Sequence, residues 1–196
     1  MFIYLVRHGE TESIRRSGWG DNRLTPYGCQ QAYNLRELVL NRKNELDIGK
    51  IYSSDLQRSI ETALPTAEAL HLNITRCPDF RAPDNGVLAN MPSEEADIKF
   101  PGLHYYSLDF DQKYPGGESP HEFYDRVIVA WKKFVKMVLP DRQNAILFSH
   151  SSVIRVVYCF VENLPYNNKD NGKIPEAELL AIDLFDEDNL RCLFKL

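Results

Sequence analysis

The sequence predicts an α/β protein with a three-layer α/β/α sandwich around a mostly parallel central sheet. Three observations support this fold class. Apolar runs typical of buried strands occur at 2–6, 51–52 and 145–148. Each run is followed, after a polar stretch, by a segment with apolar residues at helical spacing. The chain has 196 residues, of which 43% are hydrophobic, so it can bury one sizeable core and is predicted to form a single domain over 1–196.

The first strand is predicted over 2–6, and a polar loop follows it as far as Leu24. Thr25 and Pro26 predict the start of a helix, because threonine is a common N-cap and proline is favoured at the first helical position. The apolar face of this helix consists of Ala32, Leu35, Leu38 and Val39.

After the short apolar run at 51–52, Asp55 is predicted to cap the next helix. Residues at helical spacing give that helix one apolar face: Leu56, Ile60, Ala63, Leu64, Ala67 and Leu70. A short strand is expected around 72–76.

The C-terminal part of the chain continues the alternation. Ser119 to Glu122 has both the spacing of a capping box and a proline at the first helical position, so a helix is predicted from there to about Val138. The strand at 145–148 leads into a helix at about 151–162. The apolar runs 179–185 and 190–194 are predicted to form a closing hairpin.

The segment from about 78 to 117 differs from the rest, because it is rich in proline, glycine, aspartate and aromatic residues and predicts at most a short helix after Ser93. Insertions of this kind in compact domains are usually functional. Its aromatic residues have two interpretations: they line a pocket, or they pack the insertion onto the body of the protein. These residues are Phe100, His104, Tyr105, Tyr106, Phe110 and Tyr114.

Arginine or histidine follows each of three predicted strands. Arg7 and His8 come after the first strand, Arg58 lies in the first turn of the helix after the second, and His150 follows the third. Ligands of open α/β sheets bind beyond the carboxyl ends of strands, so we expect these residues to surround an anion. Arginine offers a bidentate fork to phosphoryl oxygens, and the amide of Ser151 at a helix start adds a further donor. The sequence therefore predicts an anion-binding site.

Five motifs in the same order resemble those of the histidine phosphatase superfamily, which includes phosphoglycerate mutases and small phosphomonoesterases. They are Arg7 to Thr11, Gly18 to Thr25, Ser53 to Arg58, Pro115 to Ser119, and Ser149-His150. The resemblance implies a phosphoglycerate mutase-like fold over the whole chain, with the insertion at about 78–117 covering the substrate. It also implies that His8 is the nucleophile, forming a phosphohistidine, and that His150 supports it.

The sequence departs from the family pattern at the general acid. Relatives commonly carry a glutamate after the strand that corresponds to the one expected here around 72–76, and Ala82 stands at that position in this sequence. Asp84 lies two residues further on, and residues i and i+2 of an extended chain face the same side, so Asp84 is the predicted acid and Glu118 the alternative. The loop after the first strand also differs, so phosphate contacts from that side are expected from Arg15, Arg16 or Asn22, or are missing.

The predicted function is that of a metal-independent phosphatase, which hydrolyses a small phosphorylated metabolite through a phosphohistidine on His8. One alternative is phosphoryl transfer of the phosphoglycerate mutase type. Another is a phosphate-binding regulatory module with weak or no catalysis, because Ala82 replaces the acid. No HExxH, HxH or CxxC spacing indicates a metal site, so neither a metal nor another cofactor is expected.

Charge and composition limit the kinds of partner and the cellular compartment that are expected for this protein. The net charge is −5 and no basic run is present, which argues against a nucleic-acid partner. No apolar stretch has the length of a membrane span, and the first residues belong to the predicted strand rather than to a signal peptide. The four scattered cysteines are typical of reduced thiols, so a cytoplasmic protein without a membrane partner is expected.

Overall fold

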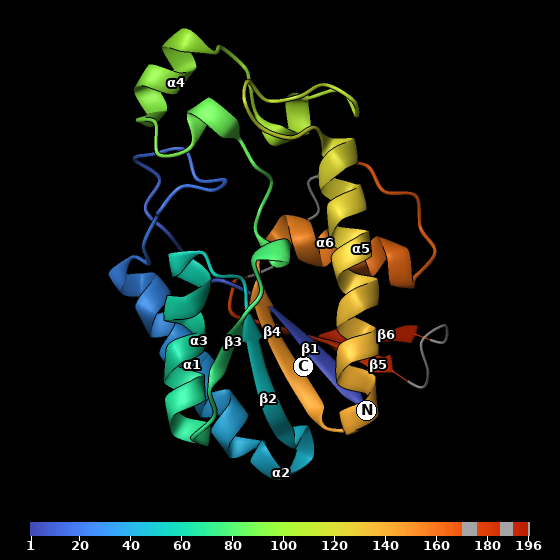
Figure 1. Cartoon of the computed structure of the whole chain (residues 1–196). Helices are drawn as coiled ribbons and strands as arrows, with labels where there is room; N and C mark the ends of the chain where they lie inside the picture. Colours follow the sequence, from blue (N-terminus) through green and yellow to red (C-terminus); the bar gives the residue numbers. More distant parts are fainter. Residues whose placement is uncertain (170–175, 185–189, 196) are drawn as a thin grey trace.

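The computed structural model describes residues 1–169, 176–184 and 190–195, and places a six-stranded sheet at the centre of the chain (Figure 1). The strand order is β3-β2-β4-β1-β5-β6. The strands are β1 (Phe2–Arg7), β2 (Ile48–Ser53), β3 (Ile74–Arg76), β4 (Asn144–Ser149), β5 (Leu179–Leu184) and β6 (Leu190–Lys195). The pairs β3-β2, β2-β4 and β4-β1 are parallel, while β5 is antiparallel to both β1 and β6. The predicted mostly parallel sheet and the closing hairpin are confirmed.

Helices cover both faces of this sheet, as predicted (Figure 1). One layer contains α1 (Pro26–Asn41), α2 (Lys43–Leu46) and α3 (Gln57–Leu70), and the other contains α5 (Pro120–Val138) and α6 (Ser151–Val161). Side chains alternate along β1: Ile3 and Leu5 pack with α5 and α6, whereas Tyr4 and Val6 pack with α1 and α3. The three-layer α/β/α sandwich is therefore confirmed.

Two of the predicted helix starts are confirmed. The Thr25 hydroxyl accepts a hydrogen bond from the Gly28 amide at 2.9 Å, and Pro26 opens α1. Ser119 and Glu122 form a reciprocal capping box at the start of α5, with hydrogen bonds of 3.1 and 3.0 Å. Both signals lie within a few residues of sequence, which explains why local patterns were sufficient to predict them.

The predicted cap of α3 is wrong. This helix begins at Gln57, its N-cap is Leu56, and no side chain caps it. The Asp55 carboxylate instead accepts two hydrogen bonds from the Arg81 guanidinium, at 2.7 and 2.5 Å. A bidentate pair with arginine is stronger than a bond to a neutral helix amide, so the long-range partner prevails over the cap.

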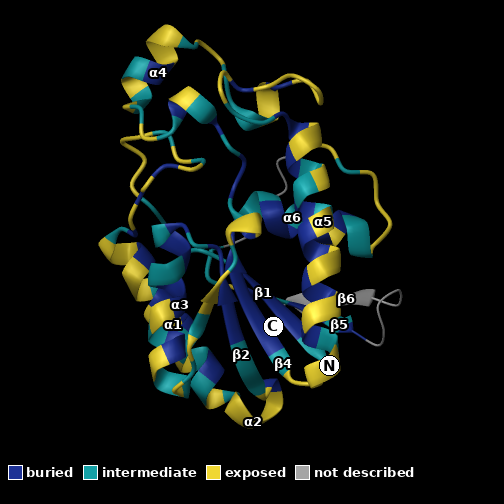
Figure 2. Cartoon of the chain, viewed as in Figure 1, coloured by how far each residue is buried: buried dark blue, intermediate teal, exposed yellow. Residues whose placement is uncertain are grey.

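The 78–117 segment lies beyond the carboxyl ends of the parallel strands, with α4 (Ser93–Lys99) at its outer end (Figure 1). Besides α4, which confirms the short helix expected after Ser93, it contains three short 3₁₀ helices: η1 (Pro78–Phe80), η2 (Gly86–Leu88) and η3 (Tyr105–Ser107). A further 3₁₀ helix, η4 (Leu139–Asp141), follows α5. Leu88, Ala96, Leu108 and Tyr114 form a small apolar cluster of the segment's own. Figure 2 shows the contrast between the buried sheet and the largely exposed surface around α4.

In the described part of the chain, no helix combines the length and the apolar character that crossing a membrane would require.

Candidate functional site

The sheet topology brings the predicted site residues to one edge. β4 lies between β1 and β2, so the turns that follow these three strands are neighbours. The His8 amide donates to the Ser149 carbonyl at 3.0 Å, and the Ser54 amide donates to the Phe148 carbonyl at 2.8 Å. These bonds fix the first residues beyond β1 and β2 against the end of β4, directly beside His150.

The turn after β1 depends on glycine. A Cβ atom on Gly9 would lie 2.6 Å from the Gly28 carbonyl oxygen, which is closer than real Cβ contacts. The Gly9 amide donates to the Thr62 hydroxyl at 3.0 Å, and this hydroxyl donates to the Arg58 carbonyl at 2.7 Å. The turn that carries His8 is therefore held against both α1 and α3.

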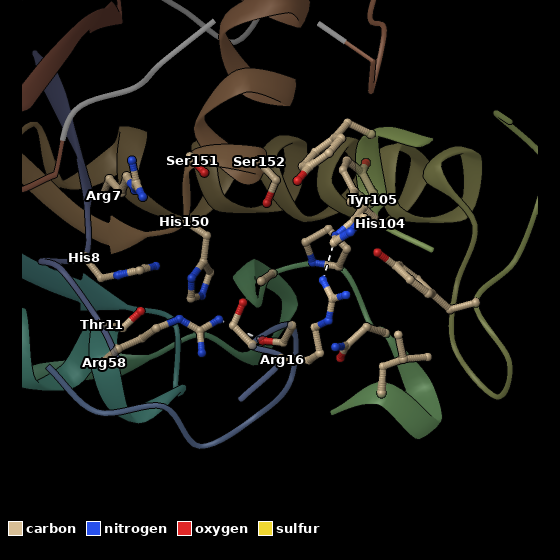
Figure 3. A pocket seen from close by; sticks show the side chains of 18 of the residues that line it. Arg7, His8, Thr11, Arg16, Arg58, His104, Tyr105, His150, Ser151 and Ser152 are labelled. Carbon is tan, nitrogen blue, oxygen red and sulfur yellow. Dashed lines mark hydrogen bonds between the residues drawn. The ribbon is translucent and has the colours of Figure 1, made fainter. Parts of the chain in front are cut away.

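A pocket of about 420 Å³ opens at this edge of the sheet (Figure 3). All five residues that the sequence predicted to bind phosphate line it: Arg7, His8, Arg58, His150 and Ser151. Figure 3 shows that Arg7, His8, Arg58 and His150 lie together at one end, which we call the inner end. The structure thus brings together cations and imidazoles from β1, α3 and the start of α6.

His8 is arranged as a neutral imidazole. Its Nδ1 atom lies 2.7 Å from the Gly9 carbonyl oxygen, and because a carbonyl only accepts, Nδ1 carries the proton. Nε2 consequently keeps its lone pair. Burial, followed by the nearby Arg58 charge, lowers the pKa of His8 to about 3. An unprotonated ring nitrogen is what nucleophilic attack on phosphorus requires.

His150 is the close partner of His8. The two ring centroids are 5.2 Å apart with an interplanar angle of 62°. Nε2 of His150 lies 2.9 Å from the Ser54 hydroxyl oxygen, within hydrogen-bonding distance. Burial, together with the Arg58 charge, holds the pKa of His150 well below its usual range, so it is also neutral near pH 7.

Arg58 lines the pocket and also holds the loop after β1. Arg58 is only 2% exposed, and its Nη1 and Nη2 atoms donate to the Gly20 and Gly18 carbonyls at 3.0 and 2.7 Å, respectively. Burial lowers its pKa to about 10, so it remains a cation near neutrality. Arg7 forms an ion pair with Glu176, with Nη2 and Oε1 at 2.9 Å. Two guanidinium groups therefore define the charge of the inner end.

The same loop is attached to the chain around Ala82. The Trp19 indole N–H donates to the Ala82 carbonyl at 2.8 Å, and the Arg81 guanidinium lies 4.8 Å from the centre of the indole. Gly18 has φ +52°, and a Cβ atom there would lie 2.0 Å from the Asn85 Oδ1 atom. Only glycine fits this position, which gives a physical reason for the Gly18-Trp19 motif.

The structure does not bring Asp84 into the pocket. Ala82, Pro83 and Asn85 line it, but Asp84 does not, and its Oδ1 atom accepts a hydrogen bond from the Gly86 amide at 2.9 Å. The prediction assumed an extended chain, whereas the backbone turns at Asn85 (ψ 12°) and Gly86 (φ +54°). The general-acid prediction for Asp84 therefore loses its geometric basis.

Glu118, the alternative acid, does not line the pocket either. It accepts hydrogen bonds from the Asp84 amide at 2.8 Å and from the Arg126 guanidinium at 2.6 Å. No aspartate or glutamate occurs among the described residues that line the pocket. The residues that the structure describes also contain no group of three or more histidine, cysteine or acidic residues placed to hold a metal ion.

We expect the substitution Asp84→Ala to act on the fold rather than on proton transfer. Loss of the bond to the Gly86 amide should destabilise the protein by about 1 kcal/mol. The ratio of kcat/KM for an alkyl phosphate to that for an aryl phosphate should stay unchanged. Thermal unfolding and the two rate measurements check this; a loss confined to the alkyl phosphate would reinstate Asp84 as the acid.

At the other end of the pocket, which we call the outer end, the structure decides between alternatives that the sequence left open (Figure 3). Of the three loop candidates, Arg16 lines the pocket, whereas Arg15 donates to the Asn90 carbonyl and Asn22 to the Glu12 and Arg15 carbonyls. Four of the six aromatic residues of the insertion line it as well: His104, Tyr105, Tyr106 and Tyr114. Both interpretations of these aromatic residues hold in part: four of them line the pocket, whereas Phe100 packs against the segment's own apolar cluster.

Known proteins resemble this chain along nearly its whole length. A family model described as "Histidine phosphatase superfamily (branch 1)" matches residues 3–193. A relative named "Probable phosphoglycerate mutase GpmB" from Salmonella choleraesuis is 34% identical over 186 residues, which cover 92% of this chain and 84% of the relative.

Solved structures show the same fold. A mycobacterial glucosyl-3-phosphoglycerate phosphatase has a TM-score of 0.77 at 21% identity, with 97% of this chain and 96% of that chain covered. A putative alpha-ribazole-5'-P phosphatase from Escherichia coli has a TM-score of 0.80 at 21% identity, with coverage of 100% and 95%. The family match over residues 3–193, with the arginines and histidines of its motifs gathered in one pocket, shows that this chain belongs to the histidine phosphatase superfamily.

Proposed function

We propose that this protein is a metal-independent phosphatase that hydrolyses a small phosphomonoester through a phosphohistidine on His8. The observation that carries the proposal is the neutral His8 ring, which keeps the Nε2 lone pair at the inner end of a pocket lined by Arg7 and Arg58. A nucleophile beside two guanidinium groups suits a dianionic phosphoryl group, whose charge must be neutralised before attack.

The reaction has two steps in this proposal. Nε2 of His8 forms a bond to phosphorus while the bond from phosphorus to the ester oxygen breaks, and the oxygen leaves with the electron pair and takes a proton from water. A water molecule then attacks the phosphohistidine, which releases inorganic phosphate and restores the neutral ring. Arg7, Arg58, His150 and the Ser151 amide at the start of α6 are the donors to the phosphoryl oxygens.

The comparisons support a phosphatase of this class. Two of the similar structures bear the names of phosphatases, one for glucosyl-3-phosphoglycerate and one for alpha-ribazole-5'-P. The volume of about 420 Å³ suits a small phosphorylated metabolite, because ligand sites of this kind span about 300–1,000 Å³. With a net charge of −5, we expect a metabolite of the cytoplasm, rather than a nucleic acid or a membrane surface, to be the partner.

Two other functions have a specific observation in their favour. The relative named as a probable phosphoglycerate mutase favours transfer of the phosphoryl group back to a phosphoglycerate. The absence of acidic residues among the described pocket lining favours a phosphate-binding module with little catalysis. The first predicts isomerisation of phosphoglycerate faster than phosphate release, and the second predicts phosphate binding without turnover.

The test is to trap the intermediate. Wild-type protein with excess chelator should hydrolyse p-nitrophenyl phosphate. A rapid quench should yield a phosphoenzyme that is labile to acid and stable to base, with the phosphoryl group on the peptide that contains His8. A phosphoryl group on another residue, or turnover that the chelator abolishes, would overturn the proposal. Binding of phosphate without any turnover would favour the binding module.

A further inference from the structure

Arg16 and His104 meet at the outer end of the pocket, although they are 88 residues apart in sequence (Figure 3). Nη1 of Arg16 lies 2.6 Å from Nδ1 of His104. Arginine only donates, so Nδ1 accepts and the proton of the neutral ring is on Nε2. The outer end therefore carries two kinds of hydrogen-bond donor, a guanidinium group and an imidazole N–H.

Arg16 is fixed in place by the protein itself. Nη2 pairs with the Asp97 carboxylate, the Arg16 amide donates to the Met91 carbonyl at 2.8 Å, and its side chain is only 17% exposed. The His104 ring stacks on Tyr106, with centroids 5.5 Å apart and an interplanar angle of 1°. A ligand would not have to order these side chains, which favours tight binding.

The guanidinium of Arg16 retains donors for a ligand. Its two terminal nitrogens carry four N–H groups, and the bonds to His104 and Asp97 use one on each nitrogen, which leaves two. Asp97 is 60% exposed and does not line the pocket, so water screens its charge. An anion at the outer end would thus meet donors, and none of the described lining residues is acidic.

One phosphoryl group does not account for this arrangement. Arg7 and Arg58 already serve the inner end, yet a third arginine lines the same pocket of a protein whose net charge is −5. The cavity of about 420 Å³ also has room for more than a phosphoryl group. Guanidinium donors at both ends of one pocket fit a ligand with an acidic group at both ends.

We propose that the leaving group of the substrate carries a second acidic group, a carboxylate or a phosphate, which binds Arg16 and His104 while the reacting phosphoryl group lies against His8. This inference rests on the proposed phosphatase function and names the class of substrate for it. It makes Arg16 and His104 residues that determine specificity.

The experiment compares three substrates that share one short alkyl chain: the plain alkyl phosphate, its ω-carboxyl derivative and the corresponding bisphosphate. Wild-type kcat/KM should be at least about tenfold higher for an acidic member than for the neutral one, as one charge-assisted hydrogen bond would provide. Which acidic member is preferred tells carboxylate from phosphate. The substitution Arg16→Gln should reduce this preference to within about twofold of unity.

Arg15→Gln is the matched control, because it removes the same charge from the same loop at an exposed side chain that does not line the pocket. It should retain the preference. Equal kcat/KM for all three wild-type substrates, or a preference that survives Arg16→Gln, would overturn the inference.

A binding measurement separates this inference from the proposed function and needs no variant. Alkylphosphonates with and without an ω-carboxyl group should bind the wild-type protein with different affinities, the carboxylated one at least about tenfold more tightly. Equal affinities would overturn the inference for a carboxylate, and the matching bisphosphonate tests it for a phosphate in the same way. Failure of wild-type turnover of p-nitrophenyl phosphate would instead count against the phosphatase function.

Discussion

Replacement of His8 with asparagine should lower kcat/KM for p-nitrophenyl phosphate by at least about 10³-fold, because the substitution removes the only group assigned to attack phosphorus. Asparagine keeps an N–H that can donate to the Gly9 carbonyl, so the turn after β1 should remain folded. Steady-state kinetics and thermal unfolding of the same preparation separate lost chemistry from lost structure.

His71→Asn is the matched control, because His71 is exposed and ends α3 in a left-handed conformation (φ 56°) that asparagine tolerates. It should retain wild-type activity. Activity of His8→Asn within about tenfold of wild type would contradict the phosphohistidine mechanism, since catalysis by the remaining donors alone is far weaker.

The low pKa of His8 also predicts how kcat/KM of the wild-type enzyme depends on pH. A pKa of about 3 leaves His8 unprotonated from pH 5 to 8, so lowering the pH through 6.5 should not remove the nucleophile of the free enzyme. Any fall of kcat/KM near pH 6 should instead follow the second ionisation of the substrate phosphate, and should shift when a phosphate ester of different acidity is used.

Substitution of Ala82 with glutamate should raise kcat for an alkyl phosphate by about 10²-fold, the contribution of a general acid to a poor leaving group. Ala82 lines the pocket at the position where the family resemblance expects the acid, and no described lining residue is acidic. An aryl phosphate should gain little, because its leaving group departs without a proton. A basic limb should also appear in the pH profile as the new carboxyl group ionises.

Ala82→Gln is the control of the same size, and it should give no such gain. An equal effect of glutamate and glutamine, or a gain as large for the aryl as for the alkyl phosphate, would contradict a role in proton transfer. The ratio of the two kcat values in each variant is the measurement that decides.

The features that could be predicted from the sequence were those encoded by neighbouring residues. The strand and helix alternation, the caps at Thr25 and Ser119, and the cations that follow the strands all depend on short patterns, and the sheet order then brings Arg7, Arg58 and His150 together. Each of these signals agrees with the others, which is why they sufficed.

Two features could not be predicted from neighbouring residues, because one depends on a distant ion-pair partner and the other on a turn of the backbone. Asp55 was predicted to cap α3, but Arg81, 26 residues away, binds its carboxylate. Asp84 was predicted to face the pocket by a rule for extended chain, but the backbone turns at Gly86. The meeting of Arg16 with His104 depends on how the insertion folds over the loop after β1, which no spacing in the sequence reveals.

The attachments between that loop and the insertion have a consequence for divergence and for engineering. The Trp19 indole N–H donates a hydrogen bond to the Ala82 carbonyl. The Arg16 amide donates to the Met91 carbonyl, and the Arg16 carbonyl accepts from the Asn90 amide. The Ser93 amide donates to the Ile14 carbonyl. The two segments therefore form one module in which a change in either disturbs the other. Transfer of selectivity between relatives should therefore require exchange of both segments together, because a chimaera with only one of them would disturb the hydrogen bonds that join the two.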